Sequence, residues 1–314
     1  MRLGLGTAAL GRPLYINLRK KGEDKTDLET FKKQSFSVLE NAYKLGVRYF
    51  DTAPGYGLAE KLLLEWVKTK NDTTIQIATK WGYTYVAGFN PNAKIHEVKE
   101  HSLSKLNEQW NVSKALLPHL KTYQIHSATL ETDVLENDAV LNQLLFLKEE
   151  YKMKIGITTT GTNQVGVIKK ALDVSVQEKP LFDAFQVTYN ILDQSLKNIS
   201  NKLNNEGKSI IIKEALANGR LFRNKNYSHY NQLYNYMETL AKKYDVGTDA
   251  IALNFCSETM SKGIILSGAS NNIHLEDNIK TNLFKLTEEE INKLYTFNIN
   301  EVTYWNERKG LTWN

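Results

Sequence analysis

The stretch GVRYFDTAPGYGLAE, residues 46–60, contains a helix end, a short strand and a glycine-containing loop in that order. Gly46 is the residue type that commonly follows the last turn of a helix. Residues 49–52 form the short apolar run expected of a buried strand. After the loop, residues 59–67 place apolar side chains on one face at helical spacing. The stretch therefore predicts one strand-loop-helix unit.

The same alternation of strand and helix continues along the whole chain. Seven further short apolar runs, rich in β-branched residues, are separated by longer amphipathic segments, and Thr287 with Glu290 forms a capping box that starts a late helix. The eight candidate strands are residues 3–7, 49–52, 75–79, 122–126, 154–158, 184–188, 209–212 and 263–266. Eight such units without a flexible linker predict an α/β fold, a closed (β/α)8 TIM barrel forming a single domain over residues 1–314.

An open doubly wound sheet is the alternative arrangement of eight strands. The segment GLGTAALG after the first run does not satisfy the dinucleotide-binding pattern G-x-G-x-x-G, and the sequence contains neither a P-loop nor G-x-S-x-G. No pair of histidines has metal-ligand spacing on a helix, so no metal site is predicted. The barrel remains the favoured fold.

Composition excludes several classes of protein. The 314 residues include 40 Lys and Arg and 35 Asp and Glu, a net charge of +5 dispersed along the chain, which predicts no nucleic-acid partner. The single Cys256 cannot form an intrachain disulfide or a structural zinc site. No apolar run approaches the ~20 residues of a membrane span, and the N-terminus does not have the pattern of a signal peptide. We expect a soluble cytoplasmic protein without a membrane partner, either a monomer or a small homo-oligomer.

Polar side chains gather where successive predicted strands end. Asp51 and Tyr56 follow the second strand, Lys80 the third and His126 the fourth. Active sites of (β/α)8 barrels lie at the C-terminal ends of the strands, and neighbouring strands are about 5 Å apart. Lys80 ends an apolar run, where a buried ammonium needs a carboxylate partner, and Asp51 on the adjacent strand can supply it. These four side chains are predicted to converge, although each alone could be a cap, packing or core residue.

The segments around these residues resemble the aldo-keto reductases. GVRYFDTAPGYGLAE, IATKWG and QIHSA are similar to three active-site signatures of that family, in the same order. FQVTYNILD, IIIKEALANGRL and LSGASNNIHLEDN extend the resemblance through the sixth, seventh and eighth strands. Within the family the chain looks closest to the bacterial sugar and aldose dehydrogenase-like branch. The resemblance implies an NAD(P)-dependent oxidoreductase that interconverts an aldehyde, ketone or aldose with its alcohol by hydride transfer.

The resemblance also implies a role for each of the four strand-end residues. Tyr56 is the general acid for carbonyl reduction and the base for alcohol oxidation, while His126 donates a hydrogen bond to the substrate oxygen. Lys80 is held by Asp51 and is expected to lower the pKa of Tyr56 from about 10, because a neighbouring ammonium favours the phenolate.

The implied cofactor is NADP or NAD, with NADP slightly favoured by the resemblance. Thr7 and Asp51 lie near the nicotinamide ribose, Gln186 binds the carboxamide and Lys213 occupies the place where the family puts a residue against the ring. The other implied contacts, along the pyrophosphate, at a helix N-terminus and near the adenine, are Thr159, Ala215, Leu216, Gly219, Arg220, Gly268, Ala269, Ser270, Asn271, His274, Asp277 and Asn278.

Three features depart from the family pattern. Thr158 and Thr159 stand where the family often has Ser-Asn, and the loop at residues 268–271 has no Lys or Arg for a 2′-phosphate, so the residues alone do not choose NADP over NAD. The first strand begins almost at Met1, without the hairpin that usually closes the lower end of the barrel. Another segment is therefore expected to cover that end.

Substrate contacts are expected from loops above the strands. Residues 11–33 form a long polar loop containing Tyr15, either a solvated loop or a lid that contacts an acidic substrate. Trp81 and Tyr83 are predicted to wall the pocket, with a core position as the alternative for Trp81. The tail, residues 299–314, carries Trp305 and Trp313 and is expected to fold over the mouth, where aromatic rings suit a sugar or ring-bearing carbonyl compound.

Two other functions are compatible with the same barrel. A catalytically weak subunit that binds the cofactor for regulation would keep the four strand-end residues. A phosphate-sugar isomerase or lyase would use the loop at residues 268–271 to bind a substrate phosphate. Activity without any nicotinamide cofactor would indicate the latter.

Overall fold

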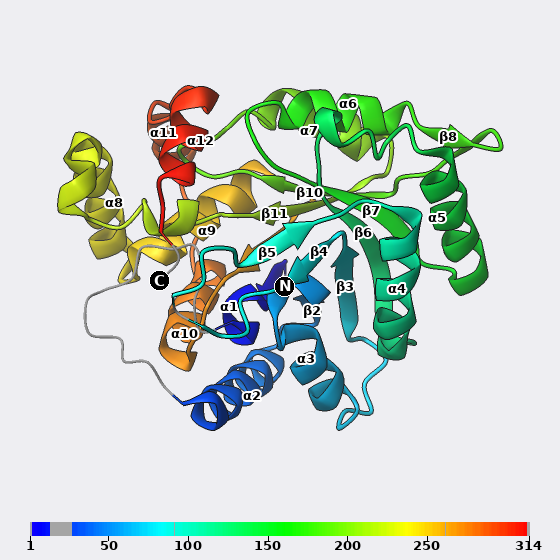
Figure 1. The fold of residues 1–314 in the computed structure, drawn as a ribbon. Coiled ribbons are helices and arrows are strands. Elements are labelled where there is room, and N and C mark those ends of the chain that lie inside the picture. The colour runs from blue at the N-terminus through cyan, green and yellow to red at the C-terminus, as the bar shows by residue number, and fades with distance from the viewer. Residues whose placement is uncertain (1, 13–26, 91, 261, 313–314) are drawn as a thin grey trace.

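A computed structural model describes residues 2–12, 27–90, 92–260 and 262–312. Eight parallel strands close into a barrel in the order β1-β12-β11-β10-β7-β6-β3-β2, which confirms the predicted single-domain (β/α)8 fold (Figure 1). The barrel strands are β1 (Leu3–Gly6), β2 (Tyr49–Asp51), β3 (Gln76–Trp81), β6 (Leu120–Ala128), β7 (Lys154–Thr159), β10 (Ala184–Thr188), β11 (Ser209–Lys213) and β12 (Ile264–Ser267).

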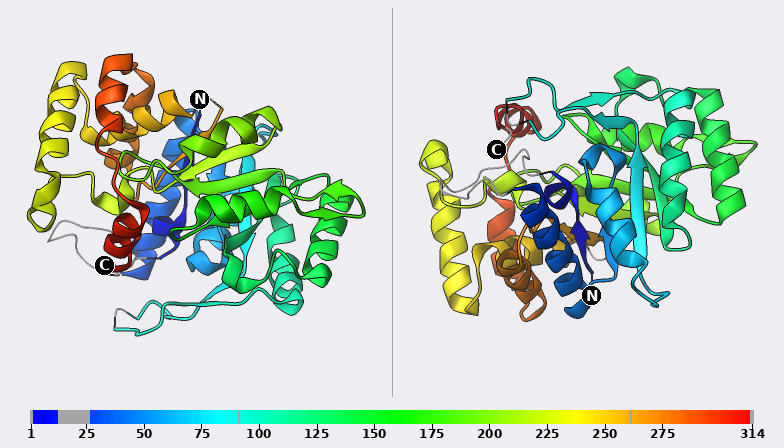
Figure 2. Two further views of the ribbon diagram at one scale, coloured as in Figure 1. Left: turned by 90° about the horizontal axis from the view of Figure 1, so that it is seen from above. Right: turned by 60° about the horizontal axis from the view of Figure 1, so that its bottom comes forward.

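The helices lie outside the ring of strands (Figure 2). Buried Leu, Ile, Val and aromatic side chains from the outer face of the strands and the inner faces of the helices form one continuous core. The helices are α1 (Ala8–Gly11), α2 (Leu28–Lys44), α3 (Ala59–Val67), α4 (Leu103–Ser113), α5 (Asp138–Tyr151), α6 (Gln164–Leu172), α7 (Lys197–Asn205), α8 (Asn231–Tyr244), α9 (Thr248–Thr259), α10 (Asn272–Ile279), α11 (Glu288–Tyr295) and α12 (Glu301–Lys309). The predicted capping box of Thr287 and Glu290 is present at the start of α11.

Two short hairpins were not predicted from the sequence. β4 (Tyr83–Tyr85) pairs antiparallel with β5 (Glu97–Lys99), and β8 (Ser175–Val176) pairs with β9 (Lys179–Pro180). Strands of two or three residues carry too little alternation to be distinguished from a loop. The β4–β5 hairpin follows β3 directly and therefore stands beside the strand end that carries Lys80.

The lower end of the barrel is narrowed by side chains of the strands themselves. The Tyr49 ring packs so closely on β1 that a Cβ added to Gly4 would lie 2.9 Å from Tyr49 Cδ1. Lys154 Nζ donates to Ser209 Oγ at 2.7 Å, joining β7 to β11. These contacts partly fill the end for which the sequence predicted a covering segment.

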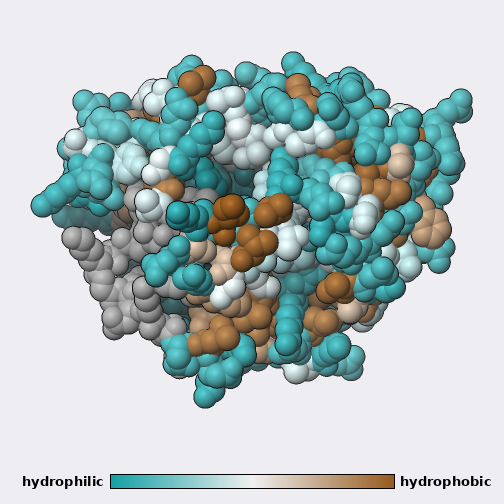
Figure 3. Space-filling model, in the orientation of Figure 1, coloured by the Kyte–Doolittle hydropathy of each residue, from teal (hydrophilic) through white to brown (hydrophobic). Residues whose placement is uncertain are grey.

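The outer surface is a mixture of polar and apolar side chains (Figure 3). On the face shown, apolar atoms gather near the centre, where Figure 1 places the β4–β5 hairpin, and this hairpin exposes Val86, Ile95 and Val98. Among the helices of the described ranges, none combines the length and the apolar composition that crossing a membrane requires.

Candidate active site

The loop that carries Tyr56 is held tightly on both sides. It contains the 3-10 turn η1 (Pro54–Tyr56), which follows β2. A Cβ added to Gly11 would lie 2.0 Å from Tyr56 O, and one added to Gly55 would lie 2.8 Å from Tyr83 Cβ. Gly57 has φ +64°, a conformation that L side chains rarely adopt. The glycines thus let the loop fit between α1 and β4, and this close packing fixes the position of Tyr56.

Asp51 and Lys80 form a buried ion pair below this loop. Lys80 Nζ lies 2.5 Å from Asp51 Oδ2 and also donates to Thr52 O at 3.0 Å. The other carboxylate oxygen, Asp51 Oδ1, accepts from Gln186 Nε2 at 2.7 Å. The pair expected from the adjacent strands is therefore present, and it is joined across the barrel to β10. Both Asp51 carboxylate oxygens and the Lys80 ammonium therefore have hydrogen-bond partners, which buried charges need if the pair is not to destabilise the fold.

Three aromatic side chains meet above the ion pair, where Lys80 and the nearby Arg12 both face the Tyr56 ring. The His126 ring, at the end of β6, lies 5.4 Å from the Tyr56 ring and 4.7 Å from the Tyr83 ring, centroid to centroid. Lys80 Nζ is 4.6 Å and the Arg12 guanidinium carbon 5.2 Å from the Tyr56 ring centroid. The four strand-end residues singled out from the sequence are therefore neighbours at one side of the barrel mouth.

Burial determines the protonation states of Tyr56 and His126. It raises the pKa of Tyr56 well above 10, and the negative charge of Asp51 adds to the increase. It lowers the pKa of His126 well below 6.5, with the positive charges of Lys80, Arg12 and Lys213 adding to the decrease. The site at neutral pH therefore holds a protonated phenol and a neutral imidazole. The expected lowering of the Tyr56 pKa is wrong for this structure, because burial and the charge of Asp51 outweigh the positive charge of Arg12, which opposes them.

The opposite side of the mouth carries a second lysine, Lys213 at the end of β11. Its Nζ donates to Thr188 Oγ1 at 2.9 Å, and the nearest oxygen of Glu214 is 3.9 Å away. Burial lowers the pKa of Lys213, an effect that Glu214 opposes. The mouth thus has Tyr56 and His126 on one side and the Lys213 ammonium on the other.

Comparison with known proteins agrees with this arrangement. A family model described as the Aldo/keto reductase family matches residues 2–299. The chain belongs to the aldo/keto reductase family.

Individual relatives are distant. The uncharacterized oxidoreductase YqkF of Bacillus subtilis (strain 168) is 24% identical over 306 residues, which cover 89% of this chain and 92% of that protein. The structure of the aldo-keto reductase AKR11C1 from Bacillus halodurans, in its holo form, matches with a TM-score of 0.67 and 22% identity, covering 93% of this chain and 91% of that one. The glycerol dehydrogenase AKR11B4 from Gluconobacter oxydans matches with a TM-score of 0.70 and 18% identity, covering 94% and 90%. At these identities the structural matches show the fold.

In this aldo/keto reductase, the polar side chains assigned to the nicotinamide end already bond to the protein. Thr7 Oγ1 donates to Asp51 O at 3.0 Å, and Gln186 donates to the Asp51 carboxylate. Thr158 Oγ1 accepts from Ser127 N at 2.7 Å, and Thr159 Oγ1 donates to Gln164 Oε1 at 3.2 Å. These contacts orient the side chains at the mouth. If the carboxamide of a cofactor bound to Gln186, the Gln186 side chain would contact both that carboxamide and Asp51.

The loop assigned to a cofactor phosphate lies between β12 and α10. Gly268 is exposed, with no heavy atom within 4 Å of a Cβ placed on it, and Ala269 behind it is buried. Asn271 is the N-cap of α10, where its Oδ1 accepts from His274 N at 2.8 Å, and Ser270 is half-buried beside it. The open space at Gly268 and the helix N-terminus fit an anionic group.

The two residues assigned to the adenine have local partners. Asp277 pairs with Lys280 at 2.7 Å on the surface of α10. Asn278 is buried, and its side chain is 2.7 Å from Ser267 Oγ, so it joins α10 to the end of β12. Asn278 thus has a structural contact in addition to the role implied by the resemblance.

The structure does not support the expected contact between Arg220 and a cofactor phosphate. The segment Ala215 to Gly219 follows β11 and contains the turn η4 (Ala217–Gly219) and the half-buried Leu216; its contact with the cofactor stays a prediction. Arg220 itself is fully buried, and its Nη1 donates to Tyr304 O at 2.9 Å and lies 3.1 Å from Glu307 Oε2. The guanidinium therefore binds α12 instead of facing a phosphate in this structure.

Helix α12 is fastened to the end of β11 by hydrogen bonds from buried or partly buried groups. Tyr304 OH donates to Glu214 Oε2 at 3.2 Å and accepts from Asn190 Nδ2 at 3.0 Å, while Arg308 Nε donates to Glu214 Oε1 at 3.1 Å. The Trp305 ring centroid is 5.7 Å from Lys213 Nζ. The described part of the tail thus lies against one side of the barrel mouth.

The residues predicted to wall the substrate pocket have different positions. Tyr83 faces His126 at the mouth, as expected for a wall. Trp81 is fully buried in the core, with its ring 5.4 Å from that of His101, because alternation along β3 turns it to the outer face when Lys80 points inward. The pocket assignment of Trp81 is therefore wrong. Tyr15 and Trp313 lie outside the described residues.

Sequence reasoning missed two ionisable groups next to the site. Arg12 is 2% exposed, and its Nη1 donates to Glu97 Oε2 at 2.8 Å and to Gly55 O at 3.1 Å, tying the Tyr56 loop to β5. Glu60 on α3 is buried and accepts from Thr79 Oγ1 at 3.1 Å. Neither contact has a local signal in the sequence, because Arg12 and Glu97 are far apart along the chain.

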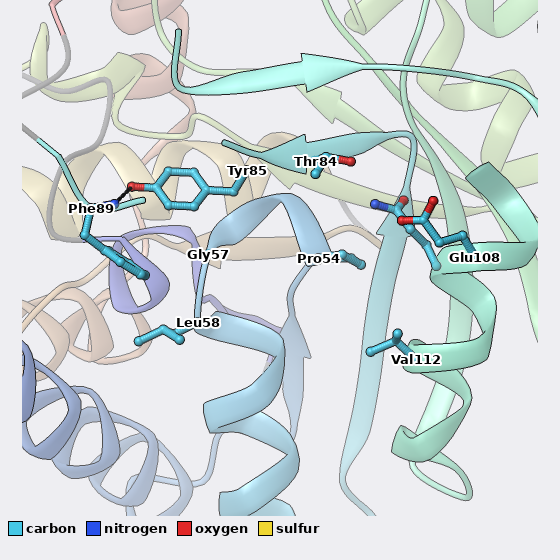
Figure 4. A pocket seen from close by; sticks show the side chains of 9 residues that line it. Pro54, Gly57, Leu58, Thr84, Tyr85, Phe89, Glu108 and Val112 are labelled. Carbon is cyan, nitrogen blue, oxygen red and sulfur yellow. Dashed lines mark hydrogen bonds between the residues drawn. The ribbon is translucent and has the colours of Figure 1, made fainter. Parts of the chain in front are cut away.

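A separate groove lies behind the Tyr56 loop (Figure 4). Tyr85 OH accepts from Phe89 N at 3.1 Å at one end of it. Neither Tyr56 nor His126 lines the groove, so it is distinct from the barrel mouth. Its lining residues are Pro54, Gly57, Leu58, Thr84, Tyr85, Phe89, Glu108, Gln109 and Val112.

Proposed function

We propose that this aldo/keto reductase is a nicotinamide-dependent enzyme that interconverts an aldehyde, ketone or aldose with the corresponding alcohol. One observation carries the proposal: the protonated Tyr56 phenol and the neutral His126 imidazole meet at the mouth, with their ring centroids 5.4 Å apart, directly above the Asp51–Lys80 ion pair. Carbonyl reduction needs a proton donor and a hydrogen-bond donor at one oxygen, and these two side chains supply both.

In carbonyl reduction, the substrate oxygen is placed between Tyr56 OH and the His126 ring. His126 donates a hydrogen bond that orients the carbonyl. A nicotinamide held at the mouth would supply the hydride for the carbonyl carbon, and Tyr56 OH transfers its proton to the oxygen. Lys80, whose Nζ lies 4.6 Å from the Tyr56 ring centroid, stabilises the phenolate left behind until it regains a proton from water. In alcohol oxidation the same phenolate accepts the hydroxyl proton.

The residues present fit the dinucleotide at both ends. Gly268, Ala269, Ser270 and Asn271 would hold a phosphate at the open start of α10, and Gln186 with Thr7 would meet the nicotinamide end. We propose NADP or NAD as cofactor, with NADP slightly favoured by the family resemblance. The side chains of Ser270 and His274 would contact the ribose that distinguishes the two.

The substrate side of the mouth is aromatic, which supports a sugar or another compound with an apolar face. Tyr83 and His126 stand on one side of the mouth. Trp305 on α12 is 3% exposed and belongs to the core, so it borders the mouth only through its contact with Lys213. Aromatic rings pack on the apolar face of a sugar while its hydroxyls bond elsewhere. An aldose or a small aldehyde is therefore the substrate class to test first.

The decisive test is Tyr56→Phe, assayed on a panel of aldoses and simple aldehydes with NADPH and NADH. We expect turnover to fall about 10²- to 10⁴-fold, the usual contribution of a positioned proton donor, while cofactor binding measured by fluorescence is unchanged. Wild-type turnover in Tyr56→Phe would refute the mechanism. Tight cofactor binding by the wild-type protein without turnover of any carbonyl compound would instead indicate a regulatory subunit.

A further inference from the structure

The barrel order places Lys213 across the mouth from the proton-transfer groups. In the ring β1-β12-β11-β10-β7-β6-β3-β2, β11 is four places from β3 and therefore diametrically opposite to it. Tyr56 and His126 belong to the side formed by β2, β3 and β6. The polar side chains ending the strands of the other side are Thr188 on β10, Lys213 on β11 and Ser267 on β12. Lys213 thus supplies the positive charge of that side.

The charge of Lys213 is only partly offset by carboxylates, because its ion pair with Glu214 is long. Its hydrogen bond goes to the neutral Thr188 hydroxyl at 2.9 Å, and the nearest carboxylate oxygen, on Glu214, is 3.9 Å away. The Glu214 carboxylate also accepts hydrogen bonds from Arg308 at 3.1 Å and from the neutral Tyr304 hydroxyl at 3.2 Å. Its negative charge is therefore shared between two cations, Lys213 and Arg308. The positive potential of Lys213 therefore extends into the mouth, where it contributes to the low pKa of His126.

The proposed reaction puts the nicotinamide ring within reach of this potential. The carbon that gives or accepts hydride must lie about 3–3.5 Å from the carbonyl carbon, whose oxygen is at Tyr56 and His126. Tyr56 and His126 stand on the β2–β3–β6 side of the mouth, while Gln186, assigned to the carboxamide, is on β10 beside β11. We therefore place the ring on the β10–β11 side, next to Lys213. The oxidised ring carries a positive charge and the reduced ring is neutral. An adjacent ammonium therefore repels one form and not the other.

We propose that Lys213 makes this site bind reduced nicotinamide more tightly than oxidised nicotinamide. Tighter binding of the reduced form raises the reduction potential of the bound couple, which favours alcohol oxidation on the enzyme. In that direction the carbinol C–H bond breaks and its electron pair moves with the hydrogen to the ring. Tyr56 first loses its phenol proton to water, the resulting phenolate accepts the hydroxyl proton of the alcohol, and a carbonyl forms. The inference rests on the proposed function and adds which cofactor state and direction the site prefers.

The test is a binding measurement that needs no turnover. Dissociation constants of NADP⁺, NADPH, NAD⁺ and NADH are measured by tryptophan fluorescence and calorimetry, without substrate, for the wild-type protein and three variants. Lys213→Met removes the charge and keeps the side-chain length, Lys213→Arg keeps the charge, and Lys154→Met removes an ammonium at the opposite end of the barrel as a control.

We expect the wild-type protein to bind the reduced form at least about tenfold more tightly, which one unit charge at several ångströms can produce. Lys213→Met is expected to lose about tenfold of this preference, mainly through tighter binding of the oxidised form. Lys213→Arg and Lys154→Met should keep it. Circular dichroism checks that each variant is folded, and Lys213→Gln replaces Lys213→Met if the latter does not fold.

Three results would overturn the inference. The first is a wild-type protein that binds both redox states equally or prefers the oxidised one, which needs no variant and leaves the proposed function intact. The second is an unchanged preference in folded Lys213→Met or Lys213→Gln. The third is no binding of any nicotinamide by the wild-type protein, which would overturn the proposed function as well.

Discussion

Glu60 is the buried carboxyl whose removal has the clearest expected effect on stability. It is 7% exposed on α3, where Oε2 accepts from Thr79 Oγ1 at 3.1 Å. Burial raises its pKa from 4.5 to about 7, although Ser113, Thr79 and the positive charge of Lys80 offset part of the increase. The substitution Glu60→Gln replaces this group with a neutral amide of the same shape.

The size and sign of the effect follow from that pKa. A carboxyl with a raised pKa in the folded state stabilises the fold only while it is protonated. Its contribution is therefore complete below pH 4.5, the unfolded value, and is lost as the pH rises to about 7. At about 1.4 kcal/mol for each pH unit between the two pKa values, the wild-type protein loses about 3 kcal/mol over this interval. Glu60→Gln is expected to avoid this loss.

The assay is urea unfolding at pH 4.5 and pH 8 for the wild-type protein, Glu60→Gln and the control Glu65→Gln, which alters an exposed carboxyl on the same helix. We expect the free energy of unfolding of Glu60→Gln, relative to wild type, to be about 3 kcal/mol higher at pH 8 than at pH 4.5, so that the variant gains relative stability as the pH rises. Glu65→Gln should show no such change. A Glu60→Gln difference that is the same at both pH values would refute the reasoning.

Two further substitutions test the packing and the charges of the site. Gly11→Ala puts a Cβ 2.0 Å from Tyr56 O, so the Tyr56 loop must move. We expect kcat to fall at least about tenfold, since small misplacements of reacting groups cost that much. The control Gly310→Ala, whose added Cβ has its nearest contact at 3.4 Å, should leave kcat unchanged. Lys80→Met leaves the Asp51 carboxylate buried without its ammonium and should lower the free energy of unfolding, measured in urea, by about 3–5 kcal/mol. The double variant Asp51→Asn/Lys80→Met should recover most of this stability. Equal losses of stability in the single and double variants would contradict the charge argument.

The strands of the barrel could be predicted because their signal is local. Each lies within a short apolar run, and the pattern of β-branched residues fixes its position to within a few residues. β6 extends to Leu120–Ala128, beyond the predicted residues 122–126, because β3 and β7 pair with it on both sides. The β4–β5 hairpin was missed because its three-residue strands are stabilised by pairing with each other and not by a local pattern.

The residues of the site could be predicted where neighbouring strands bring them together. Asp51 and Lys80 end adjacent strands, so the topology alone places them in reach of each other. Arg12 and Arg220 show the limit of this reasoning, because their partners Glu97 and Glu307 lie about 85 residues away along the chain. Which carboxylate pairs with each arginine depends on how distant loops and helices pack together, and no spacing of residues in the sequence predicts that packing.

The sequence by itself determined the barrel, its family and the four side chains at the ends of β2, β3 and β6, because periodicity and strand order act through neighbours in the chain or in the sheet. Only the tertiary structure decided the chemistry of those groups. Burial raises the pKa of Tyr56, which the sequence predicted to be lowered, and it lowers the pKa of His126. Tertiary packing also places Trp81 in the core and the Arg220 guanidinium against α12. Desolvation depends on every atom packed around a group, and those atoms come from segments that are distant in the sequence.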